Sequence, residues 1–407
     1  MNRRGRKIYR TRTGNRKRRT QKFFKVLFTI IILAALVFIG YSVGQPIYKY
    51  FSERSERGSG EETVPWTPPV MSDDTEDTDA AADDSDKASE SSDKADGEAS
   101  ISFSAYQLPE TALVSDTDFR NALESAKDSG YTAVVVTLKA KGGKIYYKTT
   151  SQMALSADGA AAGDMYAGQI AAMIRNAGFI PIAKVNLLED HNLYGEYKTG
   201  AYRFEGTTST WLDNAASSGG KPWLSPFDTD TQSYAAYLSN EISGAGFESV
   251  IFDGIVFPPF RNSDLNYIGA VVKDPNKYKS LISIADIAAK AAEANNTSVI
   301  VTVSAGDVLN GTSDLFKPAE LTVKTVSAEY FPGELENTAL INGEEIALSE
   351  LTAYERAKVV FSEIKRLAGE DITIVPALRQ TDFSQADFSD TISAFMDLGF
   401  DSYIILG

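Results

Sequence analysis

Apolar and polar positions between residues 101 and 407 predict strands and helices that alternate along the chain. Eight short apolar runs, rich in β-branched residues, each have the length of one buried strand, and they lie at 101–106, 132–138, 179–186, 249–254, 298–304, 325–330, 372–378 and 402–407. Six longer segments carry apolar residues at helical spacing, at 115–130, 164–178, 231–246, 277–294, 352–369 and 387–399. Near-continuous apolar strands separated by helices are typical of a parallel sheet that is covered on both faces.

This alternation predicts an α/β fold, a (β/α)8 TIM barrel over residues 101–407, because eight strands in about 300 residues fit that architecture. A doubly wound open sheet is the alternative. Such sheets often carry a glycine-rich phosphate loop, and no G-x-G-x-x-G or G-x-x-x-x-G-K-S/T pattern follows any of these strands. In the insertion after the sixth strand, Asn342-Gly343 predicts a two-residue hairpin turn.

A second apolar region precedes the predicted barrel. Residues 26–43 are 18 residues without a charge, and residues 1–25 hold twelve Lys and Arg and no acid. A run of this length predicts a transmembrane signal-anchor helix, and the basic flank predicts a cytoplasmic N-terminal segment. We therefore expect a single-pass protein of the cell membrane, with the lipid bilayer as partner and the C-terminal domain extracellular. A cleaved signal peptide is the alternative, but the run is long and no A-x-A site follows it.

Charge and composition narrow the function further. Residues 44–100 are rich in Asp, Glu, Ser and Ala, which predicts a disordered acidic linker. Residues 101–407 hold 39 acids and 23 bases, so nucleic acid is not an expected partner. The chain has no Cys and one His, which excludes thiol chemistry and a two-His metal site. We expect no metal and no cofactor, and His191 in its polar loop is expected to be solvated.

Candidate chemistry lies where the predicted strands end, because functional residues of such barrels lie on the loops that follow the strands. Asp253 ends the fourth strand and Glu329 the sixth. Paired carboxylates are the groups that glycosidic cleavage needs, one as acid and the other as nucleophile or base. We therefore take these two as candidate catalytic residues. The alternative is that they cap turns or form ion pairs with Lys139 or Arg379.

Polar and aromatic residues near the same strand ends are candidates for substrate binding. Lys184 and Asn186 close the third strand, and the long segment 187–228 contains two Trp residues. Aromatic rings with polar edges suit sugar faces, although they also pin down long loops. The candidate substrate-binding residues are Lys139, Asn186, Trp211, Trp223, Asp307, Tyr330, Arg379 and Gln380.

Three segments carry a resemblance to a known family. "NALESAKDSGYTAVVVTLKAKGGKIYY", "IRNAGFIPIAKVNLLED" and "KPWLSPFDTDTQSYAAYLSNEISGAGFESVIFDGIVFP" resemble, in this order, a family of bacterial (β/α)8 barrels classed as glycoside hydrolases and distantly similar to α-amylase-type barrels. The resemblance covers nearly all of 101–407 and implies a barrel that acts on carbohydrate. It carries over Asp253, together with Lys139 and Gln380.

The sequence also departs from the family pattern in ways that bear on activity. Residues that are not acids stand where the family tends to have Asp, namely Thr137, Ala140, Lys141 and Ser304. Glu329 is an acid that the pattern does not contain. Two hypotheses remain. The first is a membrane-anchored, extracytoplasmic glycoside hydrolase-like protein that acts on polysaccharide or cell-envelope glycan. The second is a catalytically inactive barrel that serves as a glycan-binding or envelope scaffold module.

Overall fold

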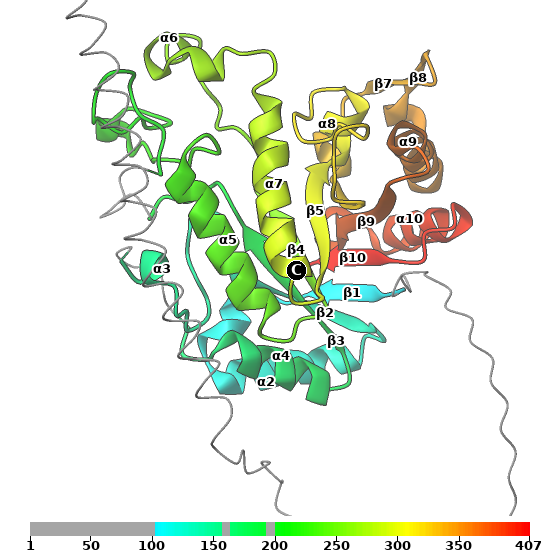
Figure 1. Ribbon diagram of the computed structural model, residues 1–407. Coiled ribbons are helices and arrows are strands. Elements are labelled where there is room, and N and C mark those ends of the chain that lie inside the picture. Colours follow the sequence, from blue (N-terminus) through cyan, green and yellow to red (C-terminus); the bar gives the residue numbers. More distant parts are fainter. Residues whose placement is uncertain (1–101, 157–162, 193–199) are drawn as a thin grey trace, which may run out of the picture. The chain divides into compact units, whose positions relative to one another are not determined.

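The structure, a computed structural model, describes residues 102–156, 163–192 and 200–407 (Figure 1). The predicted basic segment 1–25, transmembrane helix 26–43 and acidic linker 44–100 lie outside the described residues. Within the described ranges, no helix is long and apolar enough to cross a membrane.

Eight parallel strands close into a barrel, which confirms the predicted barrel over the open sheet. The hydrogen-bonded order around the barrel is β1-β10-β9-β6-β5-β4-β3-β2. Each strand coincides with one of the apolar runs: β1 (Ser104–Gln107), β2 (Ala133–Lys139), β3 (Ile180–Asn186), β4 (Ser249–Asp253), β5 (Ser298–Ser304), β6 (Thr325–Tyr330), β9 (Thr373–Arg379) and β10 (Tyr403–Leu406).

Helices surround the barrel (Figure 1). The six predicted helices are present as α2 (Asp116–Lys127), α4 (Ala167–Asn176), α5 (Thr229–Ser243), α7 (Tyr278–Glu293), α9 (Ala353–Ala368) and α10 (Gln385–Asp397). At the start of four of these helices, a side-chain oxygen accepts a hydrogen bond from a backbone N–H of the first turn. The accepting residues are Ser115, Asp228, Thr352 and Ser384. These caps satisfy donors that the first helical turn leaves free. Three further helices are short: α3 (Gln152–Ser156), α6 (Leu265–Ile268) and α8 (Ala305–Leu309).

The insertion after β6 forms the predicted hairpin. Strands β7 (Thr338–Ile341) and β8 (Glu344–Ala347) pair antiparallel. Asn342 and Gly343 between them have φ of 50° and 85°, and two positive φ values are what a type I′ turn requires. The sequence pair therefore specifies the turn.

Alternation along each strand decides which side chains face the barrel interior. On β2, Ala133 and Val135 belong to the interior apolar cluster, whereas Val134 and Val136 pack outward with the helices. The interior apolar layer also contains Ile182, Ile251 and Ile300. Since side chains of one face recur every second residue, Lys184, Asp253 and Thr302 also point inward, toward the carboxyl ends of their strands. The interior of the barrel is therefore apolar in the middle and polar at this end.

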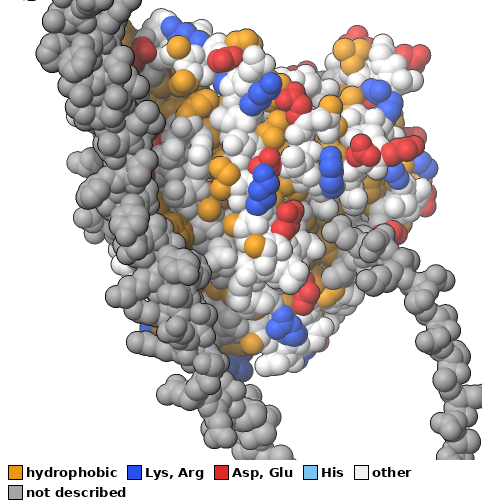
Figure 2. Space-filling view, in the orientation of Figure 1, with side chains coloured by type: hydrophobic (Ala, Val, Ile, Leu, Met, Phe, Trp, Pro, Cys, Tyr) orange, Lys and Arg blue, Asp and Glu red, His pale blue; other side chains and the backbone are white. Residues whose placement is uncertain are grey.

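Two long connections form a separate aromatic cluster beside the barrel. Buried Tyr202, Trp211 and Trp223, from the β3–α5 connection, pack with Ile268 and Val272, from the β4–α7 connection. A backbone bond from Glu205 to the carbonyl of Tyr267, 2.7 Å long, ties the two connections together, and both lie in the upper part of Figure 1. On the face seen in Figure 2, acidic and basic side chains are interspersed, without a large area of one sign.

Candidate active site

Lys184 joins the two acids that the sequence singled out. Its Nζ lies 3.3 Å from an oxygen of Asp253 and 3.0 Å from an oxygen of Glu329. Lys184 is on β3 and Glu329 on β6, and β4 and β5 lie between these strands in the barrel order. The ammonium therefore reaches across the mouth of the barrel. The sequence argument placed both acids here, and the structure brings them together.

The local backbone fixes Asp253 at the end of its strand. Its second carboxylate oxygen accepts the backbone N–H of Gly254 at 2.7 Å. Gly254 has a φ of +63°, and a Cβ at this position would collide with the side chain of Asn186. Glycine is therefore required both for the left-handed turn and for the close approach to β3. This packing holds Asn186 and Asp253 side by side.

Burial and neighbouring charges shift the pKa values of Glu329 and Lys184. Burial raises the pKa of Glu329 above its usual value, the charge of Lys184 lowers it, the charge of Asp253 raises it, and the net direction is upward. For Lys184, burial alone would lower the pKa, but the charges of Asp253 and Glu329 outweigh burial and raise it. Lys184 is thus a permanent cation. Glu329 therefore holds its proton more readily than an ordinary glutamate does, as a general acid must.

The acids open into a cleft of about 580 Å³, a size typical of small-molecule sites. Asp253 and Glu329 remain 28% and 21% exposed, whereas Lys184 is 11% exposed. The cleft is lined by the ends of β3, β4, β5 and β6 and by segments that follow β2 to β5, including Asn186, Thr302, Ser304 and Asp307. A ligand can therefore reach both carboxylates.

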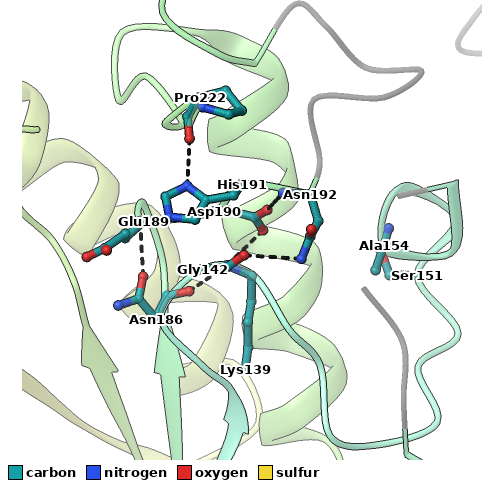
Figure 3. A network of polar contacts seen from close by, with 10 residues as sticks. All are labelled: Lys139, Gly142, Ser151, Ala154, Asn186, Glu189, Asp190, His191, Asn192 and Pro222. Atoms are coloured by element: carbon teal, nitrogen blue, oxygen red, sulfur yellow. Dashed lines mark hydrogen bonds and ion pairs between the residues drawn. The ribbon is translucent and has the colours of Figure 1, made fainter. Parts of the chain in front are cut away.

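A second lysine, Lys139, belongs to a closed polar network (Figure 3). Its Nζ lies 3.0 Å from Asp190 and donates to the carbonyl of Asn186 at 2.7 Å, and both charged side chains are at most 1% exposed. The ring nitrogen Nδ1 of His191 lies 2.8 Å from the carbonyl of Pro222. His191 lies in a loop, as expected, but it is half-buried, and the contact with Pro222 fixes its ring.

The network also anchors the loop after β2 to the loop after β3. Asn192 donates to the carbonyl of Gly142, and the backbone N–H of Glu189 donates to the side chain of Asn186 (Figure 3). The buried Lys139 faces protein on all sides. It supports the strand end that carries Asn186 and does not reach the cleft.

The other predicted binding residues divide into three groups. Asp307 lines the cleft. Arg379 and Gln380 are exposed at the end of β9, and the positive charge of Arg379 lowers the pKa of Glu329. Trp211, Trp223 and Tyr330 are buried. Both Trp rings belong to the aromatic cluster of the long connections, and Tyr330 packs outward against Phe361. In this structure, these three rings contact protein.

Sequence reasoning missed the role of Lys184. The sequence pattern places Lys184 at the end of the third strand, but it indicates a binding role only for Asn186, two residues further on. The signal was present, because Lys184 is the one charge in the otherwise apolar β3 and shares the interior face with Ile182. A lysine on that face needs a negative partner inside the barrel.

A metal centre finds no support in the described residues. No group of three or more His, Asp or Glu side chains there is arranged to hold a metal ion. Asp253 and Glu329 supply two carboxylates next to the cation of Lys184, and such groups can perform acid–base and nucleophilic chemistry.

Comparison with known proteins links the barrel to carbohydrate enzymes. Residues 106–312 match the sequence profile of a family described as "Putative glycosyl hydrolase domain", while a search of curated proteins finds no match. The structure of the glycoside hydrolase domain of PgaB (BpsB) from Bordetella bronchiseptica is 14% identical, with a TM-score of 0.51, over 74% of this chain and 92% of that one. This similarity supports the barrel fold.

Two further structures are similar at lower TM-scores. The α-galactosidase TtGalA from Thermus thermophilus is 9% identical, with a TM-score of 0.46, over 75% of this chain and 57% of that one. The glycoside hydrolase domain of PelA from Pseudomonas aeruginosa is 10% identical, with a TM-score of 0.39, over 74% of this chain and 92% of that one.

Proposed function

This chain belongs to the family of glycosyl hydrolase domains, and we propose that its barrel hydrolyses a glycosidic bond of a polysaccharide or cell-envelope glycan. The observation that carries the proposal is the pair of partly exposed carboxylates, Asp253 and Glu329, in one open cleft. Cleavage of a glycosidic bond needs two carboxyl groups with different proton affinities.

The two acids would have separate roles. Glu329, with its raised pKa, would protonate the leaving-group oxygen, and Asp253 would attack the anomeric carbon or activate water. A protonated Glu329 no longer attracts an ammonium strongly. Lys184 would then remain with Asp253, at 3.3 Å, and stabilise its negative charge.

The spacing favours retention of stereochemistry. Because Lys184 Nζ lies 3.3 Å from one acid and 3.0 Å from the other, the two contacting oxygens are less than about 6.3 Å apart, the sum of these distances. Retaining enzymes hold their carboxyl groups about 5–5.5 Å apart and inverting enzymes about 6.5–9.5 Å apart. We therefore expect a covalent glycosyl intermediate on Asp253.

The test is the release of reducing sugar from a panel of polysaccharides by wild type, Asp253→Asn and Glu329→Gln. Each substitution should lower the rate by about 10²–10⁴-fold, because it removes a group that transfers a proton or forms a bond. Asp128→Asn, at an exposed helix end, is the matched control and should keep full activity. Unchanged melting temperatures would exclude unfolding, and full activity of Asp253→Asn would refute the mechanism.

One observation favours a second candidate, a barrel that binds glycan without cleaving it. The ammonium of Lys184 lies between the two carboxylates, where the scissile bond would have to enter. If the ammonium stays there in the complex, the acids act only as hydrogen-bond acceptors. Retention of wild type on a glycan matrix, with no product from any polysaccharide in the panel, would favour this candidate.

We further propose that residues 26–43 anchor the chain in the cell membrane with residues 101–407 outside. The support is the uncharged run of 18 residues that follows twelve basic residues. Protease added to intact cells should then remove the barrel domain from the cell. Protection of this domain, together with its digestion after lysis, would contradict the proposed orientation.

A further inference from the structure

The cleft contains more negative than positive charge. The carboxylates that line it are Glu189, Asp253, Asp307, Asp314 and Glu329. Two lysines line it, Lys141 and Lys277, and Lys184 reaches in from β3. The excess is two negative charges when all these groups are ionised, and one when Glu329 carries its proton. A ligand that enters this cleft is therefore exposed to a negative potential.

The two lysines that line the cleft already contact other side chains, whereas two of the carboxylates that line it form no ion pair with a described residue. Lys141 lies 3.2 Å from Glu189, and the ammonium of Lys277 lies 4.9 Å from the centre of the Phe257 ring. Among the described residues, neither Asp307 nor Asp314 forms an ion pair. Asp307, in the short helix α8 that follows β5, accepts a hydrogen bond from the hydroxyl of Thr312 at 2.9 Å, which orients its carboxylate.

A buried hydroxyl in the same cleft also lacks a partner. Thr302 faces the barrel interior, is 8% exposed and lines the cleft. Its oxygen has no hydrogen-bond partner among the described residues. A buried polar atom left unpaired destabilises the fold, because it has lost its hydrogen bond to water. A ligand group that hydrogen-bonds to Thr302 would remove this destabilisation, so the inner wall of the cleft favours a polar ligand.

From these contacts we infer that the cleft takes a polysaccharide whose sugar units carry free, protonated amino groups. An ammonium has three donors and no acceptor, which matches unpaired carboxylates and an unpaired hydroxyl oxygen. The same charges repel uronic acids and phosphorylated sugars. The inference rests on the proposed function, since it names the substrate class of the same cleft.

The experiment compares two ligands with the same sugar backbone, one with free ammonium groups and one with neutral N-acetyl groups. A β-1,4-linked glucosamine oligosaccharide and its fully N-acetylated form are titrated into the full-length Glu329→Gln variant, in which turnover is slow. We expect the free amine to bind up to about tenfold more tightly, because two partly exposed ion pairs each add a modest gain in affinity. Added salt should reduce this difference.

Variants assign the effect to the cleft. Asp307→Asn combined with Asp314→Asn should remove most of the preference for the free amine. Glu344→Gln combined with Glu345→Gln, on the exposed hairpin, removes the same charge elsewhere and should leave it intact. Equal binding of the two forms, or equal effects of the two double variants, would overturn the inference.

A panel of neutral glucan and xylan oligosaccharides separates the two proposals. If neutral ligands bind and are cleaved by wild type while the amine form is ignored, the inference is wrong and the proposed function stands. If no oligosaccharide binds or is cleaved, both are wrong.

Discussion

Two lysines at the carboxyl ends of neighbouring strands have opposite environments. Lys139 on β2 is fully enclosed with Asp190, and its remaining hydrogen bond goes to a backbone carbonyl. Lys184 on β3 meets two carboxylates that stay open to a cleft. Both are lysines within otherwise apolar strands, so residue type alone does not separate them. The difference lies in which partners the adjoining loops and strands supply.

The comparison shows how one barrel end can hold both a support and a reactive group. A buried ion pair that is enclosed on all sides carries a desolvation cost that only its own partners offset, so it tolerates no loss of either partner. A partly exposed cluster can exchange one partner for a ligand. The Lys139–Asp190 pair therefore stabilises the fold, whereas the cluster of Lys184, Asp253 and Glu329 is open to a ligand and can react with it.

The largest expected effect is on stability. Lys139→Met leaves Asp190 buried without its cation, which should destabilise the protein by about 3–5 kcal/mol. Lys184→Met leaves two carboxylates that solvent can reach, so its cost should be much smaller. Thermal unfolding followed by circular dichroism measures both. Equal losses of stability for the two variants would remove the distinction between the closed cluster, Lys139 with Asp190, and the open cluster, Lys184 with Asp253 and Glu329.

A rescue variant checks that the unpaired charge causes the loss. Lys139→Met combined with Asp190→Leu removes both charges and should recover most of the stability, because apolar replacement of a whole buried pair is often neutral. If the double variant is as unstable as Lys139→Met alone, the loss comes from packing instead.

A smaller effect is expected at the glycine that lets Asp190 approach. Gly143 has a φ of +88°, and a Cβ there would collide with the Asp190 carboxylate. Gly178 has a similar φ of +92° with open space around it. Gly178→Ala should cost about 1–2 kcal/mol for the left-handed backbone alone. Gly143→Ala should cost more, because it also disturbs the buried pair. Equal melting temperatures of the two variants would contradict this role of Gly143.

The strands and helices were predictable because each carries its own periodicity. The hairpin was predictable from Asn342-Gly343, and the pair Asp253 and Glu329 from strand ends that meet at one face of a barrel. The alternation of side chains along β6 separates two of the predicted site residues. Glu329 and Tyr330 are consecutive on β6, so they cannot both face the interior, and Tyr330 packs outward.

Contacts between distant parts of the chain determine the partners of Lys139 and Trp211, which the local sequence pattern does not predict. By alternation, Lys139 belongs on the interior face with Ala133 and Val135, but the register with β3 shifts between Thr137 and Lys139. Its side chain then meets Asp190, which lies 51 positions further along the chain. Trp211 likewise resembled a sugar-binding ring until its partners from the β4–α7 connection were known. Such partners depend on loop conformations that local spacing does not encode.

The smallest expected effect, a displaced pH profile, tests the open cluster directly. Burial raises the pKa of Glu329, and the charge of Lys184 lowers it by a smaller amount. If Glu329 is the general acid, hydrolysis declines as the pH rises through its pKa, because the proton is lost. Lys184→Met removes the lowering influence, so this alkaline decline should move to higher pH. Lys184→Arg keeps the charge and should leave the decline in place, as should the rescue variant Lys139→Met combined with Asp190→Leu. A profile that moves equally in all three variants would mean that Lys184 acts through the fold, and the two lysines would then differ in burial but not in role.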